Sequence, residues 1–211
     1  MSFIRATVQD AAVGVAVTEQ SKNLSDFLMP GCAAAIWRKQ MPADFQSWID
    51  NLDPTHLPQG RIIVRPETVR SAVEEICDLS QTPICQHRDQ LIDDIVVLAD
   101  IFAGLMQPRY LRMRLDVVTS NACRKFHIDA ITSRLVCTYR GTGTQYGIST
   151  NGDDPTRVFT VPTGAPILLR GTLWPEKPAS GLLHRSPPIE GTGETRLVLV
   201  LDAMSDLVDD T

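Results

Sequence analysis

The spacing of apolar residues changes at Pro108, and this change constrains the possible folds more than any other feature of the chain. In residues 66–80 and 86–106, apolar side chains recur every three or four positions, as expected for the buried face of a helix. In residues 110–120 they recur at every second position, which is typical of a strand with one buried face. The sequence therefore predicts helices before Pro108 and strands after it.

The region after Pro108 consists of short apolar runs separated by turns rich in glycine and proline. Several short strands at this spacing suggest a β-sandwich or barrel, because too few helices lie between them for a doubly wound parallel sheet. We expect an α+β protein whose mainly helical part, residues 1–107, and β-rich part, residues 108–211, form one compact unit. The predicted strands are residues 110–120, 133–140, 157–162, 165–174 and 195–204.

The first of these runs alternates between apolar and charged residues. Successive side chains of a strand point to opposite faces, so the apolar set is expected to face the core and the charged set to face outward. The inward set is Leu111, Met113, Leu115 and Val117, and the outward set is Arg112, Arg114 and Asp116.

Composition and charge narrow the functional classes. The net charge of −5 and the scattered lysines and arginines argue against nucleic-acid binding, and no apolar run is long enough for a membrane span. The N-terminus, residues 1–17, lacks a clear cleavage site, so we expect a cytoplasmic protein. Five cysteines without regular spacing indicate reduced thiols rather than a disulfide framework.

A candidate metal site begins at His127. Asp129 follows two residues later, so in an extended strand both side chains would point to the same face and reach one cation. His184 is the only other histidine in the β-rich half, and it ends an apolar run just before a pair of prolines. Two imidazoles and one carboxylate suit a divalent transition metal, as in the facial triad of non-haem Fe(II) oxygenases.

An arginine follows the second histidine of this group. Arg196 opens a strongly apolar run, twelve residues after His184, and Thr195 precedes it. A guanidinium at the mouth of a sheet offers a forked donor for a carboxylate, to which Thr195 could add a hydroxyl. This pair would suit the distal carboxylate of a keto-acid cosubstrate.

The order His127-x-Asp129, His184, Arg196 resembles the motif order of the Fe(II)- and 2-oxoglutarate-dependent dioxygenases. This resemblance covers about the last 100 residues of the chain. It implies a double-stranded β-helix of the jelly-roll or cupin type for the β-rich part, with the N-terminal helices packed on it. It also implies that the two histidines and the aspartate bind iron and that Arg196 anchors 2-oxoglutarate.

The chain also resembles an uncharacterised bacterial family, domain of unknown function number 1826, over most of its length. The segments that carry this likeness are "AIWRK", "CRKFHIDAITSRLVCTYRGTGTQYG" and the closing "LLHRSPP" and "TRLVLVLD". Members of this family are associated with zinc-responsive genes and metallochaperone GTPases. The resemblance therefore implies a role in metal homeostasis, and it leaves the activity open.

Two cysteines bear on the identity of the metal. Cys123 lies four residues before His127, and Cys137 lies on the following predicted strand. Thiolate ligands would favour Zn(II) over an oxygenase iron, although a cysteine in an apolar run is commonly a core residue. Further residues that could line the mouth of the pocket are Thr142, Thr144, Gln145 and Tyr146, with Tyr139 and Trp174 as aromatic walls.

Two functions, and a purely structural alternative, remain open at this point. The first is an Fe(II)- and 2-oxoglutarate-dependent oxygenase acting on a small molecule or a protein side chain. The second is a non-catalytic protein of zinc or metal homeostasis that uses the same residues. In the third, no metal is bound and the His–Asp pair is structural. An exposed edge strand could mediate a homodimer.

Overall fold

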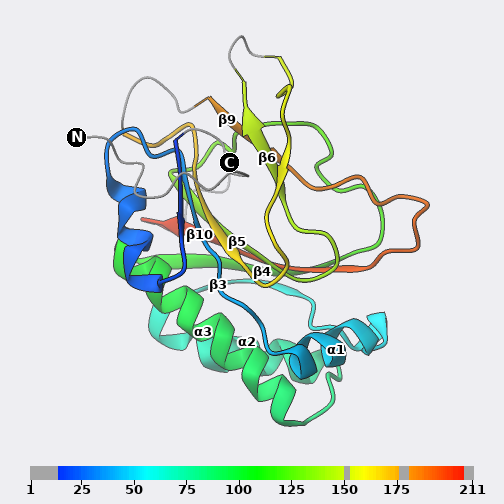
Figure 1. The fold of residues 1–211 in the computed structure, drawn as a ribbon. Coiled ribbons are helices and arrows are strands. Elements are labelled where there is room, and N and C mark those ends of the chain that lie inside the picture. The colour runs from blue at the N-terminus through cyan, green and yellow to red at the C-terminus, as the bar shows by residue number, and fades with distance from the viewer. Residues whose placement is uncertain (1–13, 150–152, 176–180, 207–211) are drawn as a thin grey trace.

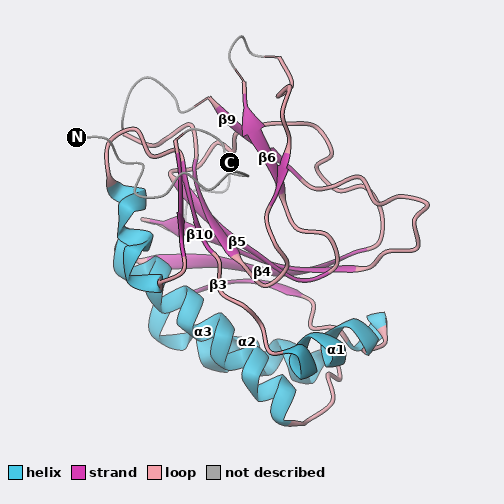
Figure 2. Cartoon of the chain, viewed as in Figure 1, coloured by secondary structure: helices cyan, strands magenta, loops and turns pink. Residues whose placement is uncertain are grey.

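The chain forms two β-sheets, with a layer of helices on the outer face of the larger one (Figures 1 and 2). The computed structural model describes residues 14–149, 153–175 and 181–206. The larger sheet has seven strands in the order β1-β2-β8-β5-β10-β4-β3, and the smaller has three in the order β7-β6-β9. The strands are β1 (Val15–Thr18), β2 (Ala34–Trp37), β3 (Gly60–Val64), β4 (Tyr110–Val118), β5 (Ser133–Arg140), β6 (Gln145–Ile148), β7 (Phe159–Thr160), β8 (Pro166–Arg170), β9 (Leu182–Arg185) and β10 (Arg196–Met204).

The helices cover one face of the larger sheet because each buries an apolar stripe against it. In α3, the residues Leu91, Ile95, Leu98 and Phe102 are fully buried and recur at helical spacing, as the sequence predicts. Helix α3 packs on β10, α2 on β3 and α1 on β5. The helical segments are η1 (Ser21–Leu28), α1 (Ala43–Asn51), η2 (Pro54–His56), η3 (Pro66–Thr68), α2 (Val69–Leu79) and α3 (Gln86–Met106).

Strand β10 lies at the centre of the larger sheet, antiparallel to both of its neighbours β4 and β5. Leu199 pairs with Leu115 on one side and with Cys137 on the other, and all three side chains point into the core beneath the helices. Val198 and Val200 point to the opposite face, into a second apolar cluster between the two sheets. The strand is therefore buried on both faces, which explains its nearly continuous apolar sequence.

The charged face of β4 does not face outward, contrary to the expectation from its alternation. Leu111, Met113 and Leu115 are fully buried beneath the helices, as predicted. Arg114 and Asp116, however, line a cavity on the other face of the sheet. Alternation distinguishes the two faces of a strand but does not reveal what covers each face. Here the second layer covers the charged face.

Most predicted elements are present, and several strands occur where none was expected. The helix at residues 86–106 and the strand at residues 133–140 are confirmed, whereas residues 157–162 contribute only the two-residue strand β7. Strands β1, β2 and β3 join the larger sheet from the mainly helical part of the chain. They were missed because runs of four or five residues carry too little periodicity. The division at residue 107 stays a prediction.

No helix in the described part of the chain is long and apolar enough to cross a membrane. The prediction about the N-terminus rests mainly on residues 1–13, which lie outside the described residues.

A buried polar cluster joins α3 to the sheet and generates a prediction about Tyr139. Its hydroxyl donates a 2.7 Å hydrogen bond to Asp94 Oδ2, and Lys39 forms an ion pair with the same carboxylate. Tyr139→Phe removes a buried bond to a charged group, so we expect the free energy of unfolding in urea to fall by about 1–3 kcal/mol. Tyr110→Phe is the matched control, because Tyr110 is half-buried and its hydroxyl has no hydrogen bond to any residue that the structure describes. A loss of bound metal without a loss of stability would contradict this structural role.

Candidate metal centre

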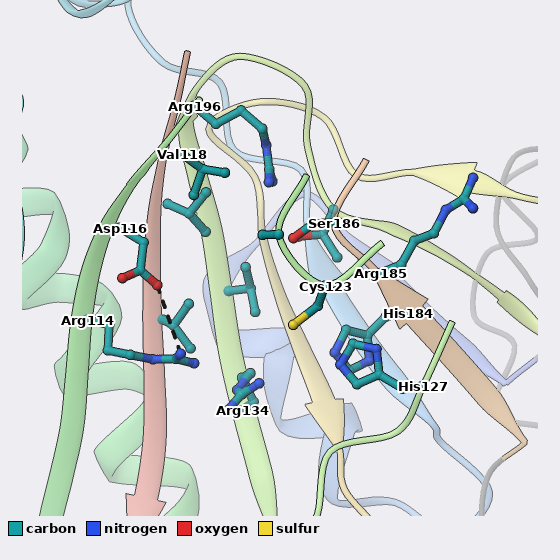
Figure 3. Close-up of a pocket in the computed structure, with 15 residues that line it drawn as sticks. Arg114, Asp116, Val118, Cys123, His127, Arg134, His184, Arg185, Ser186 and Arg196 are labelled. Atoms are coloured by element: carbon teal, nitrogen blue, oxygen red, sulfur yellow. Dashed lines mark ion pairs between the residues drawn. The ribbon is translucent and has the colours of Figure 1, made fainter. Parts of the chain in front are cut away.

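The two histidines of the candidate site are brought together by backbone pairing. His127 lies in the connection between β4 and β5, and His184 lies on β9. Each donates its backbone N–H to the carbonyl of the other, at 3.0 Å in both directions. Their ring centroids are consequently only 4.5 Å apart (Figure 3). Residues 57 positions apart therefore present two imidazoles at one point.

Asp129 completes a group of three possible ligands with these imidazoles. Its Oδ2 lies 3.0 Å from His184 Nε2, and its Oδ1 lies 3.6 Å from His127 Nε2. One ligand atom from each residue lies within 4.8 Å of the other two. Two ligands each about 2.1 Å from a shared ion are themselves separated by about 3.0–3.4 Å. The spacing of these side chains therefore suits a single metal ion.

The orientation of both imidazoles also suits a metal. His127 Nδ1 lies 2.9 Å from the carbonyl oxygen of Lys125, which can only accept, so Nδ1 carries a proton and Nε2 is the nitrogen on the side of Asp129. For His184, burial lowers the pKa, although Asp129 opposes this shift. Both rings thus present Nε2 to Asp129.

The carboxylate of Asp129 is charged and incompletely satisfied. Burial raises its pKa, but His184 and Arg134 outweigh burial and bring the pKa down to about 2. Its buried Oδ2 is close to Arg134 Nη1, at 2.7 Å, and to His184, yet neither contact has the direction of a hydrogen bond. This ionised oxygen therefore has acceptor capacity that a metal ion could use.

Arg134 lies between Asp129 and a second carboxylate, that of Asp202, and contacts both. On β5, Arg134 pairs across the sheet with Asp202 of β10, which is only 2% exposed. Its Nε and Nη2 bind the two oxygens of Asp202 at 2.6 and 2.9 Å, and Nη1 is left to face Asp129. The sequence analysis missed both residues. They could have been recognised because each is a charged residue within a mostly apolar strand, at a position that faces inward.

A cavity of about 160 Å³ connects this group to Arg196 (Figure 3). Its floor is apolar and comes from Val136, Val198 and Val200, and Thr144 also lines it, as expected. The other lining residues are Arg114, Asp116, Val118, Ala122, Cys123, His127, Arg134, His184, Arg185, Ser186 and Arg196.

Arg196 is a buried cation that forms no ion pair within the described part of the chain. The residue is only 1% exposed, and its Nε and Nη2 donate to the carbonyl of Thr142 at 2.7 Å and to Thr138 Oγ1 at 3.4 Å. The charge of Glu194 attracts Arg196, but its carboxylate accepts hydrogen bonds from Thr142. Burial lowers the pKa of Arg196 to about 10, so it stays charged at neutral pH.

Three of the other predicted site residues lie away from the cavity. Cys137 and Tyr139 occupy alternate positions of β5 that face the helices, whereas Val136 faces the cavity. Burial accordingly raises the pKa of the Cys137 thiol to about 12, which does not favour metal binding. Trp174 packs against Phe27, with ring centroids 5.1 Å apart. The parity of the strand, which the sequence analysis did not apply to these residues, explains the first two corrections.

The remaining predicted residues lie near the cavity. Cys123 is exposed and lines it, but does not belong to the group of three possible ligands. Thr195 precedes Arg196 but is not a lining residue, and Gln145 Oε1 accepts a 2.8 Å hydrogen bond from Arg185 Nε. The structure thus brings together His127, Asp129, His184 and Arg196.

The bridge from Asp202 to Asp129 generates a prediction about stability. Arg134→Gln would leave two partly or fully buried carboxylates without their cation, so we expect the free energy of unfolding to fall by about 3–5 kcal/mol. Arg134→Lys should lose less, because it keeps the charge but not the fork. Arg124→Gln, an exposed arginine of the same connection, is the control, expected within about 0.5 kcal/mol of wild type in urea. Wild-type stability of Arg134→Gln would refute the bridge.

Two of the solved structures that are similar to this chain are described as oxygenases. The dioxygenase for auxin oxidation 1 from Arabidopsis thaliana, in its complex with 2-oxoglutarate, has a TM-score of 0.51 at 9% identity, over 93% of this chain and 94% of that one. An oxidoreductase of the 2OG-Fe(II) oxygenase family from Burkholderia pseudomallei has a TM-score of 0.45 at 15% identity, over 89% and 92% of the two chains. The first likeness shows a shared fold, a jelly roll combined with helices.

The sequence itself matches a family model. No curated protein matches this sequence. The model described as "Protein of unknown function (DUF1826)" matches residues 18–202, a span that contains all four residues brought together at the site. The resemblance noted from the sequence is thereby confirmed. Since the match extends over most of the chain, this protein belongs to the DUF1826 family of proteins of unknown function.

Proposed function

We propose that this protein is an Fe(II)- and 2-oxoglutarate-dependent oxygenase that acts on a small molecule or a protein side chain. The observation that carries the proposal is the buried guanidinium of Arg196, which has no ion pair among the described residues and lines the same cavity as His127 and His184. Burying an uncompensated charge is unfavourable, so its retention is explained if an anionic ligand completes it. The shared fold with a dioxygenase that binds 2-oxoglutarate supports the same function.

The cavity has the features that 2-oxoglutarate requires. Arg196 would bind the distal carboxylate through its fork, and the hydroxyl of Thr138 lies beside the guanidinium. The methylene carbons would pack on Val198 and Val200, which separate Arg196 from Asp202 along β10. The keto-acid end would then reach the metal group.

His127, Asp129 and His184 would hold the iron. Iron held in this way would supply the activation of dioxygen: one oxygen atom would pass to the substrate, and the other would enter the succinate that forms as 2-oxoglutarate loses carbon dioxide. Arg134 keeps the carboxylate of Asp129 ionised and oriented, and the valine floor limits the access of water.

The alternative function is non-catalytic metal binding in zinc homeostasis. One observation favours it, because the exposed thiol of Cys123 lines the same cavity as the two histidines. A thiolate, two imidazoles and a carboxylate would suit tetrahedral zinc. Cys123 nevertheless lies outside the group of three possible ligands, and zinc binding alone gives Arg196 no role. The oxygenase therefore accounts for more of the site.

Thermal unfolding tests the role assigned to Arg196. In wild-type protein loaded with Zn(II) as a redox-inert substitute for iron, 2-oxoglutarate at about 100 times its Kd should raise the Tm by about 5–10 °C. Arg196→Met should abolish this shift. Without ligand, its free energy of unfolding should stay within about 1 kcal/mol of wild type, because it replaces an uncompensated buried charge.

Two controls make this test specific. Arg196→Lys keeps a charge but loses the fork, so it should retain a reduced shift. The compound 2-oxobutanoate has the keto-acid end but no distal carboxylate, and its effect should be the same in wild type and Arg196→Met. If 2-oxoglutarate does not stabilise the wild-type protein, the oxygenase proposal is wrong.

Metal analysis of purified variants separates the two functions. Because the ligand group excludes Cys123, we expect Cys123→Ser to keep the wild-type metal content, whereas His184→Ala should lose most of it. The measurement is elemental analysis together with succinate formation from 2-oxoglutarate under air with added Fe(II). Loss of zinc in Cys123→Ser, with no succinate from the wild type, would favour metal homeostasis.

A further inference from the structure

A second arginine that lines the cavity, Arg114, also has no hydrogen-bonded carboxylate within the described part of the chain. Arg114 lines the cavity from β4, its side chain is 20% exposed, and its buried Nε has no hydrogen bond within the described part of the chain. The nearest carboxylate oxygens are Asp116 Oδ2 at 3.9 Å and Asp202 Oδ2 at 4.0 Å. Both distances exceed that of a hydrogen bond. Most of the donor capacity of this guanidinium is therefore unused.

The neighbouring charges do not compensate for this deficit. The Asp202 oxygen that faces Arg114 already accepts a hydrogen bond from Arg134 Nη2 at 2.9 Å. Arg134 also repels Arg114, so that burial and this repulsion together lower the pKa of Arg114. Asp116 is its remaining counter-charge, and this carboxylate is 35% exposed. An anionic ligand would complete Arg114, as it would complete Arg196.

The two unsatisfied arginines serve different positions in the cavity. Arg114 stands beside Val200, whereas Arg196 stands beside Val118, four residues further along β4. Their backbones are thus separated by roughly 13 Å, too far for both side chains to occupy one subsite without converging from opposite directions. Figure 3 shows Arg114 on the β4 wall, across the cavity from His127 and His184. A molecule held by Arg114 would face the metal group from that wall.

We propose that Arg114 binds the carboxylate of the primary substrate, which is a small monocarboxylic acid with an apolar body. The inference rests on the proposed function, because it assigns Arg196 to 2-oxoglutarate. The planar fork of an arginine matches a carboxylate. Asp116, beside it, disfavours a second negative charge, and Val200, the neighbour of Arg114 on β10, lines the cavity with apolar atoms.

Carboxylates and their uncharged amides provide the test. The probes are straight-chain monocarboxylates of two to six carbons and benzoate, each compared with its primary amide, on Zn(II)-loaded protein with and without saturating 2-oxoglutarate. At least one carboxylate should raise the Tm of the wild-type protein while its amide does not. Arg114→Gln should weaken the binding of that carboxylate by about 10- to 100-fold, the effect of losing a charge-assisted hydrogen-bond pair.

Three further variants show whether the effect belongs to Arg114 itself. Arg114→Lys should bind with intermediate affinity, and it keeps the test valid if Arg114→Gln folds poorly. Asp116→Asn should bind the carboxylate about two- to tenfold more tightly, because a repelling charge is removed. Arg109→Gln removes an exposed arginine just before β4, outside the cavity, and should bind as wild type does. Opposite effects at positions 114 and 116 would not follow from a purely structural role.

Each contrary outcome has a distinct meaning. If no carboxylate distinguishes wild type from Arg114→Gln and Arg114→Lys, the proposal is overturned. It is also overturned if Arg114→Gln loses 2-oxoglutarate itself and the monocarboxylates have no effect, because Arg114 would then belong to the cosubstrate site. If wild type fails to bind 2-oxoglutarate but still binds a monocarboxylate through Arg114, the oxygenase assignment fails and the carboxylate site stands.

Discussion

The pairing of β10 with β4 and β5 is the constraint on which the rest of the structure depends. The strand Arg196–Met204 pairs with β4 over its whole length and with β5 from Leu197 to Asp202, and it is buried on both faces. It carries Arg196 at one end and Asp202 six residues later, on the same face. These two residues are thus roughly 20 Å apart along the backbone. Through Asp202 and Arg134, it also positions Asp129.

The inner face of the sheet combines apolar packing with charges that are not fully compensated. Arg134 is held by two carboxylates, whereas Arg114 and Arg196 have no hydrogen-bonded carboxylate among the described residues. Buried charges of this kind reduce the stability of the folded state, which explains why they gather in one cavity and not throughout the sheet. In the function that we propose, the metal occupies one end of the cavity, a dicarboxylic cosubstrate the other, and an acidic substrate the β4 wall.

The four residues of the candidate site and their order could be predicted from the sequence, but most of the residues that surround them could not. His127, Asp129, His184 and Arg196 were identified from spacing and order, and the structure brings them together. The sequence predicted that the charged face of β4 points outward, whereas it faces the cavity. Period-two alternation looks the same whether the polar face meets solvent or a polar cavity. Arg134 and Asp202 were missed because their pairing depends on a register between strands 68 residues apart.

By itself, the sequence determined the helix of residues 86–106, the central strands and the residue types of a metal site, since each depends on local periodicity or on ligand chemistry. Tertiary structure alone decided which side of each strand became the cavity. Cys137 and Tyr139 face the helices while Val136 and Thr138 face the site, because the second sheet and its loops cover only one face. It also decided that Arg114 and Arg196 have no full partner, since the position of every carboxylate depends on long-range packing.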